Sequence, residues 1–452
     1  MKNLIDKYNI PAPRYTSYPT VPYWDEISPT PEQWGKLVKD TFQQTNDAYG
    51  ISLYIHLPFC ESLCTYCGCN TRITINHGVE VPYIKAVLKE WNLYLALFGE
   101  KPKIKEIHLG GGTPTFFSPD NLKLLINGIR SKAMICKDAE FSFEAHPNNT
   151  TGEHLQTLYD LGFRRLSLGI QDFDNKVQDI INRVQTYEQV YEITSKARNI
   201  GYTSINYDLI YGLPLQTETS VIETIKKVIT LHPDRIAYYS YAHVPWIKPG
   251  QRKFTEADLP SGQVKRNLYE LGRKMLVENS FVETGMDHFS LPDDELYVSS
   301  KNKTLHRNFM GYTTSNTKLL LGLGVSSISD TWTGFGQNPK KVEAYYDAID
   351  LGVFPIVKGH QLTTEDLIIR QHILNIMCNQ ETSWEMPSEQ YDALYAALNR
   401  LTEMEKDDLI TLSPFHLKVK EAGKPFLRNV CMAFDARLWE KEPQNQLFSS
   451  TI

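Results

Sequence analysis

Four cysteines lie within ten residues, in the stretch "CESLCTYCGC" at 60–69. Cys60, Cys64 and Cys67 have the spacing C-x3-C-x2-C and directly follow an apolar stretch that predicts a strand. Three thiolates on one short loop can each bind one iron of a [4Fe–4S] cluster, which leaves the fourth iron open to a substrate. Zinc sites with four cysteines usually have two separate C-x2-C pairs, and this stretch has no second pair. A simple redox pair would leave Cys60 and Cys69 unexplained.

Length and composition limit the class of protein. The chain has 452 residues, of which 41% are hydrophobic and 22% are charged, as in ordinary globular proteins. A net charge of −6 argues against a nucleic-acid-binding protein. No apolar run is long enough for a membrane span, and the first residues lack a signal-peptide core. We therefore expect a cytoplasmic protein with reduced thiols, and seven cysteines, an odd number, fit poorly with a disulfide framework.

Strand and helix patterns alternate from residue 51 onward. The expected strands are 51–59, 104–112, 139–146, 164–171, 204–214 and 235–245, with one more short strand at 281–289. The expected helices are 84–98, 118–133 with Ser118 as N-cap, 151–161, 175–183, 187–200, 218–231 and 261–279. Such repeats predict an α/β fold, a parallel sheet with crossover helices. Six units can form a partial (β/α)6 TIM-like barrel, although the pattern alone also allows a closed eight-stranded barrel or an open doubly wound sheet.

The chain divides into three expected parts. Residues 1–50 contain Pro11, Pro13, Pro19 and Pro22, which preclude a regular helix there, so we expect an N-terminal arm that is mostly extended. Residues 51–335 form the expected barrel domain. Residues 340–452 form an expected C-terminal domain that is mainly helical, because the segments 364–379 and 387–410 have helical patterns.

Distinctive residues fall at the carboxyl ends of the expected strands. They are Cys60, Gly110–Gly112, Glu144, Gln171, Asp208 and Ala242. In barrels of parallel strands, sites form at that face, so we expect these residues to converge. The three glycines allow the backbone to approach a ligand closely, or simply form a tight turn. Asp208 lies in an otherwise apolar strand, where a carboxylate is costly unless it is paired or ligated.

Longer stretches of the sequence resemble a known family. The cysteine spacing with Tyr66 before the last cysteine resembles that of radical S-adenosylmethionine (SAM) enzymes. The stretches "PRYTSYPT", "YIHLPFCESLCTYCGCN", "LGGGTPT", "DLIYGLP", "GMDHF" and "HRNFMGYTT" together resemble the oxygen-independent coproporphyrinogen III oxidases, also called coproporphyrinogen dehydrogenases. The resemblance extends from about residue 8 to "RNVCMAFD" at 428–435.

The resemblance implies a radical SAM barrel, a [4Fe–4S] cluster on Cys60, Cys64 and Cys67, and two SAM molecules per chain. The SAM on the cluster would be contacted by Tyr54, Gly111, Glu144 and Ile328. The second SAM would be contacted by Tyr66, Gly112, Thr113, Gln171, Arg183, Asp208 and Ala242. Taken alone, Glu144 would be a surface or capping residue, Ile328 a core residue and Arg183 a solvated arginine at a helix end.

The implied substrate, coproporphyrinogen III, is a tetracarboxylate, so cationic side chains must bind it. Arg14, His288, His306 and Arg307 are the candidates, with the N-terminal arm as a lid. No catalytic residue is assigned, but Tyr54 and Cys69 are candidates. Cys69 is not expected to ligate the cluster; it would aid a late electron step or only pack.

The resemblance implies that a 5′-deoxyadenosyl radical takes hydrogen from the β-carbon of a propionate. Loss of carbon dioxide and one electron then leaves a vinyl group, and two such reactions give protoporphyrinogen IX. An unidentified electron donor and a terminal acceptor are required, and we expect a monomer.

The alternative within the superfamily is a haem chaperone or haem-opening relative, which lacks the "PRYTSYPT" arm and has Phe where this chain has Cys69. A plain iron–sulfur electron carrier would need a fourth protein ligand. Two positions depart from the family pattern: His146 stands where an acidic residue is expected, and Met310 where glutamine is expected.

Overall fold

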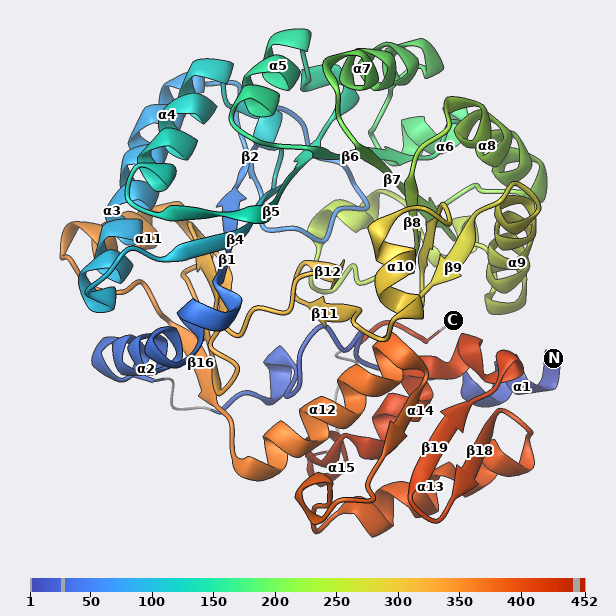
Figure 1. Ribbon diagram of the computed structural model, residues 1–452. Coiled ribbons are helices and arrows are strands. Elements are labelled where there is room, and N and C mark those ends of the chain that lie inside the picture. The colour runs from blue at the N-terminus through green and yellow to red at the C-terminus, as the bar shows by residue number, and fades with distance from the viewer. Residues whose placement is uncertain (1, 26–28, 442–447, 452) are drawn as a thin grey trace.

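The largest element of the fold is a curved sheet of twelve strands, with helices on its outer surface (Figure 1). The computed structural model describes residues 2–25, 29–441 and 448–451. Six strands pair in chain order and in parallel: β1 (Ile51–Leu57), β4 (Lys103–Gly111), β5 (Met134–Ala145), β6 (Arg165–Gln171), β7 (Ser204–Tyr211) and β8 (Arg235–Ser240). A seventh, β13 (Leu320–Leu323), pairs in parallel with β1.

Both ends of the sheet are antiparallel, and among the described residues they do not pair with each other. On the β13 side the order continues with β14 (Ile328–Asp330), β15 (Gly334–Gln337) and β16 (Lys358–Gln361). On the β8 side it continues with β10 (His288–Ser290) and β9 (Val282–Thr284). The sheet is therefore an open, partial barrel, which confirms the predicted (β/α)6 class.

Helices that follow the parallel strands cover the outside of the sheet (Figure 1). They are α3 (Glu80–Phe98), α4 (Pro119–Arg130), α5 (Gly152–Asp160), α6 (Asn175–Ile180), α7 (Tyr187–Ile200), α8 (Glu218–Leu231) and α9 (Gly262–Glu278). Local capping sets where they begin: Ser118 accepts a hydrogen bond from the Asn121 amide at the start of α4, as predicted, and Thr186 forms a capping box with Gln189 at the start of α7.

The N-terminal segment is less extended than expected. It contains α1 (Lys2–Tyr8) and the long helix α2 (Pro31–Tyr49), whereas residues 9–25 have no α-helix. Pro31 lies in the first turn of α2, where proline is tolerated, and Thr30 forms a capping box with Gln33. The extended interpretation was wrong for residues 31–49. Positions 1 and 26–28 lie outside the described residues.

The end of the chain also differs from expectation. Residues 342–361, assigned to the C-terminal domain, supply α11 (Val342–Asp350) and β16, and β16 pairs with the barrel sheet. The C-terminal unit has α12 (Thr364–Asn379), α13 (Leu394–Lys406), α14 (Leu427–Phe434) and α15 (Ala436–Glu440). It adds a small sheet of β17 (Glu381–Ser383), β19 (His416–Val419) and β18 (Ile410–Ser413). Residues 442–447 and 452 lie outside the described residues.

Short elements complete the fold. They are β2 (Phe59–Cys60), β3 (Arg72–Ile73), α10 (Glu295–Lys301), β11 (His306–Asn308) and β12 (Gly311–Thr313). The single strand expected at 281–289 is instead the hairpin β9–β10, because Gly285 between them has a φ of 69°.

Both ends of the chain are tied to the C-terminal unit by one buried arginine. The Arg428 guanidinium donates to the carbonyls of Pro13 (2.9 Å) and Ser450 (3.0 Å), and also to that of Ala12. Pro11 and Ser450 form an antiparallel bridge. The arm is therefore held in place at the side of the barrel, with Arg14 next to it.

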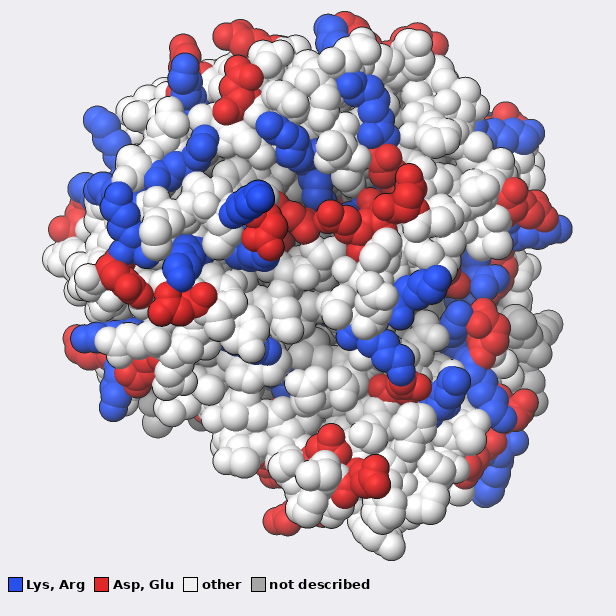
Figure 2. Space-filling model, in the orientation of Figure 1, with Lys and Arg blue, Asp and Glu red and all other residues white. Residues whose placement is uncertain are grey.

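On the face seen in Figure 2, Lys and Arg are interspersed with Asp and Glu over the barrel and the C-terminal unit. Within the described part of the chain, no helix combines the length and the apolar character needed to cross a bilayer.

A buried carboxyl group joins three parts of the barrel wall. Glu90 of α3 is fully buried and accepts hydrogen bonds from the Gly324 amide (2.7 Å), Tyr345 Oη (2.6 Å) and Asn338 Nδ2 (2.7 Å). Burial raises the pKa of Glu90 to about 7, although these hydrogen bonds oppose the shift. The folded protein thus binds a proton that the unfolded chain releases near pH 4.3.

Glu90 predicts a pH dependence of stability. Because the pKa is raised on folding, the stabilisation is complete below about pH 4.3 and is lost as pH rises through about 7, at a cost of up to about 3 kcal/mol. Glu90→Gln should abolish this loss, so the wild-type thermal midpoint should fall relative to that of the variant between pH 5 and pH 8. Anaerobic thermal unfolding of both proteins at pH 5 and pH 8 measures this change in the difference between their thermal midpoints. A constant difference between the two proteins would contradict the prediction.

Candidate active site

The cysteine loop between β2 and β3 is held by contacts with distant segments. The Thr65 amide donates to the Ile181 carbonyl (2.9 Å), and Asn182 Nδ2 donates to the Leu63 carbonyl (2.8 Å). The buried Gln251 side chain donates to the carbonyls of Tyr66 (3.2 Å) and Ala242 (3.1 Å). The loop is therefore anchored both to the end of α6 and to the segment that follows β8.

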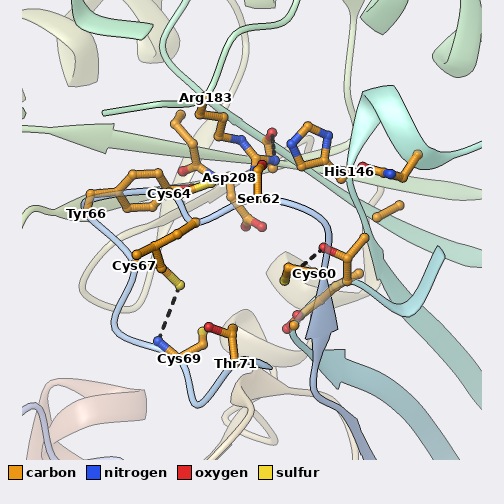
Figure 3. A pocket seen from close by; sticks show the side chains of 18 of the residues that line it. Cys60, Ser62, Cys64, Tyr66, Cys67, Cys69, Thr71, His146, Arg183 and Asp208 are labelled. Carbon is orange, nitrogen blue, oxygen red and sulfur yellow. Dashed lines mark hydrogen bonds between the residues drawn. The ribbon is translucent and has the colours of Figure 1, made fainter. Parts of the chain in front are cut away.

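The loop forms one wall of a cavity of about 410 Å³ at the carboxyl ends of the parallel strands. Figure 3 shows Cys60, Cys64, Cys67 and Cys69 around this cavity. Cys60 Sγ lies 3.3 Å from Thr113 Oγ1, and the Cys69 amide donates to Cys67 Sγ at 3.4 Å. The convergence expected at this edge of the sheet thus brings the cysteines to the end of β4.

The three thiols of the loop suit a [4Fe–4S] cluster. Such a cluster takes each thiolate on a different iron, so its ligands stand apart from one another. Three free thiols on the wall of one cavity fit that group.

A half-buried arginine supplies positive charge next to the thiols. Arg183 Nη2 donates to the Gly169 carbonyl at 2.6 Å, and Nη1 lies 3.7 Å from Cys64 Sγ. Its Nε has no hydrogen-bond partner in the described structure. A Cβ on Gly169 would lie 2.6 Å from this guanidinium, so glycine is needed for the arginine to fit. A cation here favours thiolates and an anionic cluster.

The glycine run is required by close packing. Gly111 has a φ of 113°, and a Cβ on it would lie 2.6 Å from the His56 ring. A Cβ on Gly112 would lie 2.6 Å from the Pro58 backbone. Gly111 and Gly112 both line the cavity. The tight turn predicted as one alternative for these glycines is therefore present, and the close approach of a ligand stays a prediction.

Glu144 presents a carboxylate to the cavity from the end of β5. It accepts a hydrogen bond from the Gly111 amide (3.1 Å) and lies 3.5 Å from His108 Nε2. Burial opposes ionisation, but the hydrogen bonds and charge of His108 and the bond from Gly111 outweigh it and lower the pKa of Glu144. Tyr54 stacks on His108, with ring centres 5.9 Å apart. Glu144 is thus an anionic acceptor suited to an ammonium group.

Asp208, the carboxylate in an apolar strand, is satisfied by its neighbours. Ser167 Oγ donates to one oxygen (3.0 Å) and Asn206 Nδ2 to the other (2.8 Å). Burial, with the charge of Glu144, raises the pKa of Asp208 to about 6. It lines the same cavity as the thiols (Figure 3).

Most predicted cofactor-binding residues line this cavity. They are Cys60, Cys64, Tyr66, Cys67, Gly111, Gly112, Thr113, Glu144, Gln171, Arg183 and Asp208, together with Cys69 and His146. Tyr54, Ala242 and Ile328 are not among its lining residues: Tyr54 lies behind Glu144, Ala242 contacts Gln251, and Ile328 packs against the cluster around Trp24 and Phe335.

The four predicted substrate residues lie elsewhere. Arg14 donates to the Ser240 carbonyl at 2.7 Å, and His288 Nδ1 lies 2.7 Å from Asp287. Arg307 is buried over the Tyr312 ring and donates to the Arg14 carbonyl at 3.4 Å. His306 lies near Trp332, where burial and then the charge of Arg370 lower its pKa to about 3, so it is not a cation at neutral pH.

Several residues that shape the site were missed from the sequence. His108, Ser167 and Asn206 position the two carboxylates, Gln251 anchors the loop, and Tyr239 lines the cavity. His108 precedes Gly110 and Asn206 precedes Asp208 by two positions, and Ser167 precedes Gln171 by four, so period-two alternation along each strand was the available signal.

The open parallel barrel and the three-cysteine loop at its carboxyl edge define a radical SAM protein, and a family model described as the Radical SAM superfamily matches residues 54–228. An oxygen-independent coproporphyrinogen III oxidase from Synechocystis is 37% identical over 99% of this chain and 97% of its own length. The oxygen-independent coproporphyrinogen III oxidase from Escherichia coli is 38% identical over 99% of this chain and 98% of its own length. A solved structure of coproporphyrinogen III oxidase from Escherichia coli covers 96% of this chain and 98% of its own, with a TM-score of 0.88 and 36% identity.

The chain therefore belongs to the oxygen-independent coproporphyrinogen III oxidase family. Membership in the radical SAM superfamily implies a [4Fe–4S] cluster and SAM as cofactors.

The packing of the glycines predicts the effect of a methyl group. Gly111→Ala forces a Cβ against His56 in a backbone conformation that disfavours it, which costs about 1–3 kcal/mol. The thermal midpoint should fall by several degrees, and iron retention should fall with it. Gly68→Ala in the cysteine loop is the matched control, because no atom lies within 4 Å of its added Cβ. Equal thermal midpoints for the two variants would show that the close contact at Gly111 is tolerated.

Proposed function

We propose that this chain converts coproporphyrinogen III to protoporphyrinogen IX without oxygen, by oxidative decarboxylation of two propionate side chains to vinyl groups. The observation that carries the proposal is the three-thiol loop at the mouth of a partial barrel, in a chain that matches the family over 99% of its length. The proposal includes two SAM molecules per chain, an external electron donor, a terminal electron acceptor, and a monomeric cytoplasmic enzyme.

When bound, the cluster and SAM supply a hydrogen-abstracting radical by one-electron cleavage of SAM. Cys60, Cys64 and Cys67 would hold three irons, and the Arg183 charge beside Cys64 would offset part of their negative charge. Glu144 is ionised, is fixed by Gly111 and His108, and would accept hydrogen bonds from the SAM ammonium group. The reaction would require the barrel wall and the bound ligands together to keep water and unwanted hydrogen donors away from the reacting atoms.

Asp208 is proposed to bind the second SAM. Ser167 and Asn206 each donate to one of its oxygens, which fixes the carboxylate toward the cavity. Tyr66, Thr113 and Gln171 line the same cavity. Polar groups from the cysteine loop and from β6 and β7 therefore face one ligand volume next to the thiols.

An anaerobic assay with SAM, dithionite and coproporphyrinogen III tests the proposal. The wild type should form protoporphyrinogen IX and 5′-deoxyadenosine, whereas Cys64→Ala should form neither, because one iron loses its ligand. Cys136→Ala, a thiol outside the cavity, is the control and should remain active. If Cys64→Ala forms as much 5′-deoxyadenosine as the wild type, the cluster assignment is refuted. Deoxyadenosine without protoporphyrinogen in the wild type would favour a haem chaperone or haem-opening relative.

Asp208→Ala should reduce product formation at least about tenfold, since a charged hydrogen-bond acceptor contributes about 1.5–3 kcal/mol. Cluster iron should change little, because Asp208 is not a thiol ligand. Iron per chain and product yield, measured on the same preparation, separate the two effects. Asp120→Ala, on the exposed first turn of α4, is the control. A parallel loss of iron would mean that Asp208 serves folding instead.

A further inference from the structure

A second cavity, of about 590 Å³, lies where the barrel, the N-terminal arm and the C-terminal unit meet. Its lining comes from α1, α9, the β9–β10 hairpin and the start of α14. Much of the wall is apolar or aromatic: Ile5, Tyr211, Tyr269, Met286, Phe426 and Leu427. Cavities of 300–1,000 Å³ with such walls and a few polar groups are typical of small-molecule sites.

Two arginines face this cavity without a carboxylate partner. Arg14 donates to the Ser240 carbonyl, and Arg428 donates only to backbone carbonyls of the arm and of the C-terminal tail. Across the described chain, neither guanidinium forms an ion pair. Arg428 is only 5% exposed, and burial, followed by the charge of Arg14, lowers its pKa to about 9. Two like charges therefore lie close together in a poorly hydrated place.

The acidic residues of the wall form their ion pairs with other cations. Glu270 pairs with Arg266, Glu283 with Arg273 (2.8 Å), Glu421 with Lys424 (2.7 Å), and Asp287 with His288 (2.7 Å). The charge of Asp287 also acts on Arg14 and Arg428, and so offsets their charge in part. Because buried charge is costly unless it is paired, an anionic ligand in the cavity would add counter-charge to both guanidinium groups.

The second cavity adjoins the thiol cavity through two strand ends. On β8, Tyr239 lines the thiol cavity and the next residue, Ser240, lines the second cavity. On β7, Ile210 lines the thiol cavity and the next residue, Tyr211, lines the second cavity. Arg14 bonds to Ser240 at this boundary. Because successive residues of a strand face opposite sides of the sheet, the ends of β7 and β8 form the wall between the two cavities.

We propose that the second cavity binds the tetracarboxylate macrocycle of the substrate, with Arg14 and Arg428 facing its carboxylates and one propionate directed around the ends of β7 and β8 toward the thiol cavity. This assignment rests on the proposed function for the identity of the ligand. The apolar and aromatic walls suit a tetrapyrrole ring, and the unpaired guanidinium groups suit its carboxylates.

The test uses the anaerobic holoenzyme and a stable fluorescent probe, coproporphyrin III, which has four carboxylates. Arg14→Ala should raise its Kd by about 10- to 100-fold, as loss of a charged hydrogen bond does. Met286→Trp, which fills the cavity without changing charge, should do the same. Arg130→Ala, an arginine on α4 that bonds to the Leu161 carbonyl, is the control and should bind normally.

A second probe and turnover data separate charge from shape. Mesoporphyrin IX has two carboxylates, so Arg14→Ala should lower the preference for coproporphyrin over mesoporphyrin, whereas Met286→Trp should weaken both. In turnover, Arg14→Ala should raise KM for coproporphyrinogen III more than it lowers kcat. A variant counts as folded when its iron content and its thermal midpoint match those of the wild type.

The outcomes also separate this assignment from the proposed function. The cavity assignment alone would be overturned if the wild type makes protoporphyrinogen and both folded variants, Arg14→Ala and Met286→Trp, bind coproporphyrin with the wild-type Kd. A wild type that binds coproporphyrin through Arg14 but makes no protoporphyrinogen would overturn the proposed function and retain the cavity as a tetrapyrrole site.

Discussion

The cysteine loop has almost no regular structure of its own and depends on hydrogen bonds from the rest of the barrel. Ile181 and Asn182 fix its middle, and Gln251 fixes Tyr66 from the segment after β8. Three thiols can face one cavity only if these distant segments already lie at the same edge of the sheet. The parallel order of β1 and β4–β8 provides that edge, because all six strands end there.

The residues around the thiols follow from the same constraint. Gly169 is small because Arg183 must pass it to reach Cys64, and Gly111 is small because His56 fills the space above it. Glu144 and Asp208 keep polar partners from neighbouring strands, which allows carboxylates in an otherwise apolar barrel. Backbone packing, charge and thiol placement thus depend on one register of the sheet.

The sequence predicted the central sheet well because buried parallel strands and their helices have strong local patterns. Residues 204–211, for example, are apolar, short and flanked by turn residues, and Ser118 marks a helix start. We did not predict α2, because the prolines before residue 23 favoured an extended segment. Thr30 and Gln33 form the capping box of α2 and were a sequence signal for its start. Strands β14–β16 are only three or four residues long, too short for a periodic pattern.

The parts of the site built by distant segments were not predictable in the same way. His108 and Asn206 could be inferred from alternation along single strands, but Gln251 bonds to Tyr66 across 185 positions. The second cavity needs Arg14, Tyr211, Met286 and Arg428 together, and no local pattern joins them. The resemblance to a family supplied residues such as Ile328, which sequence periodicity alone would place in the core.

The role of Arg428 has a consequence for the order of folding. The arm of residues 9–25 is anchored at Arg428, 415 positions from Pro13, and is bridged to Ser450. Contacts between such distant positions form late, because loop-closure entropy opposes them. The local strand–helix units of the barrel can therefore form first, and the arm docks only after the segments around Arg428 and Ser450 are in place.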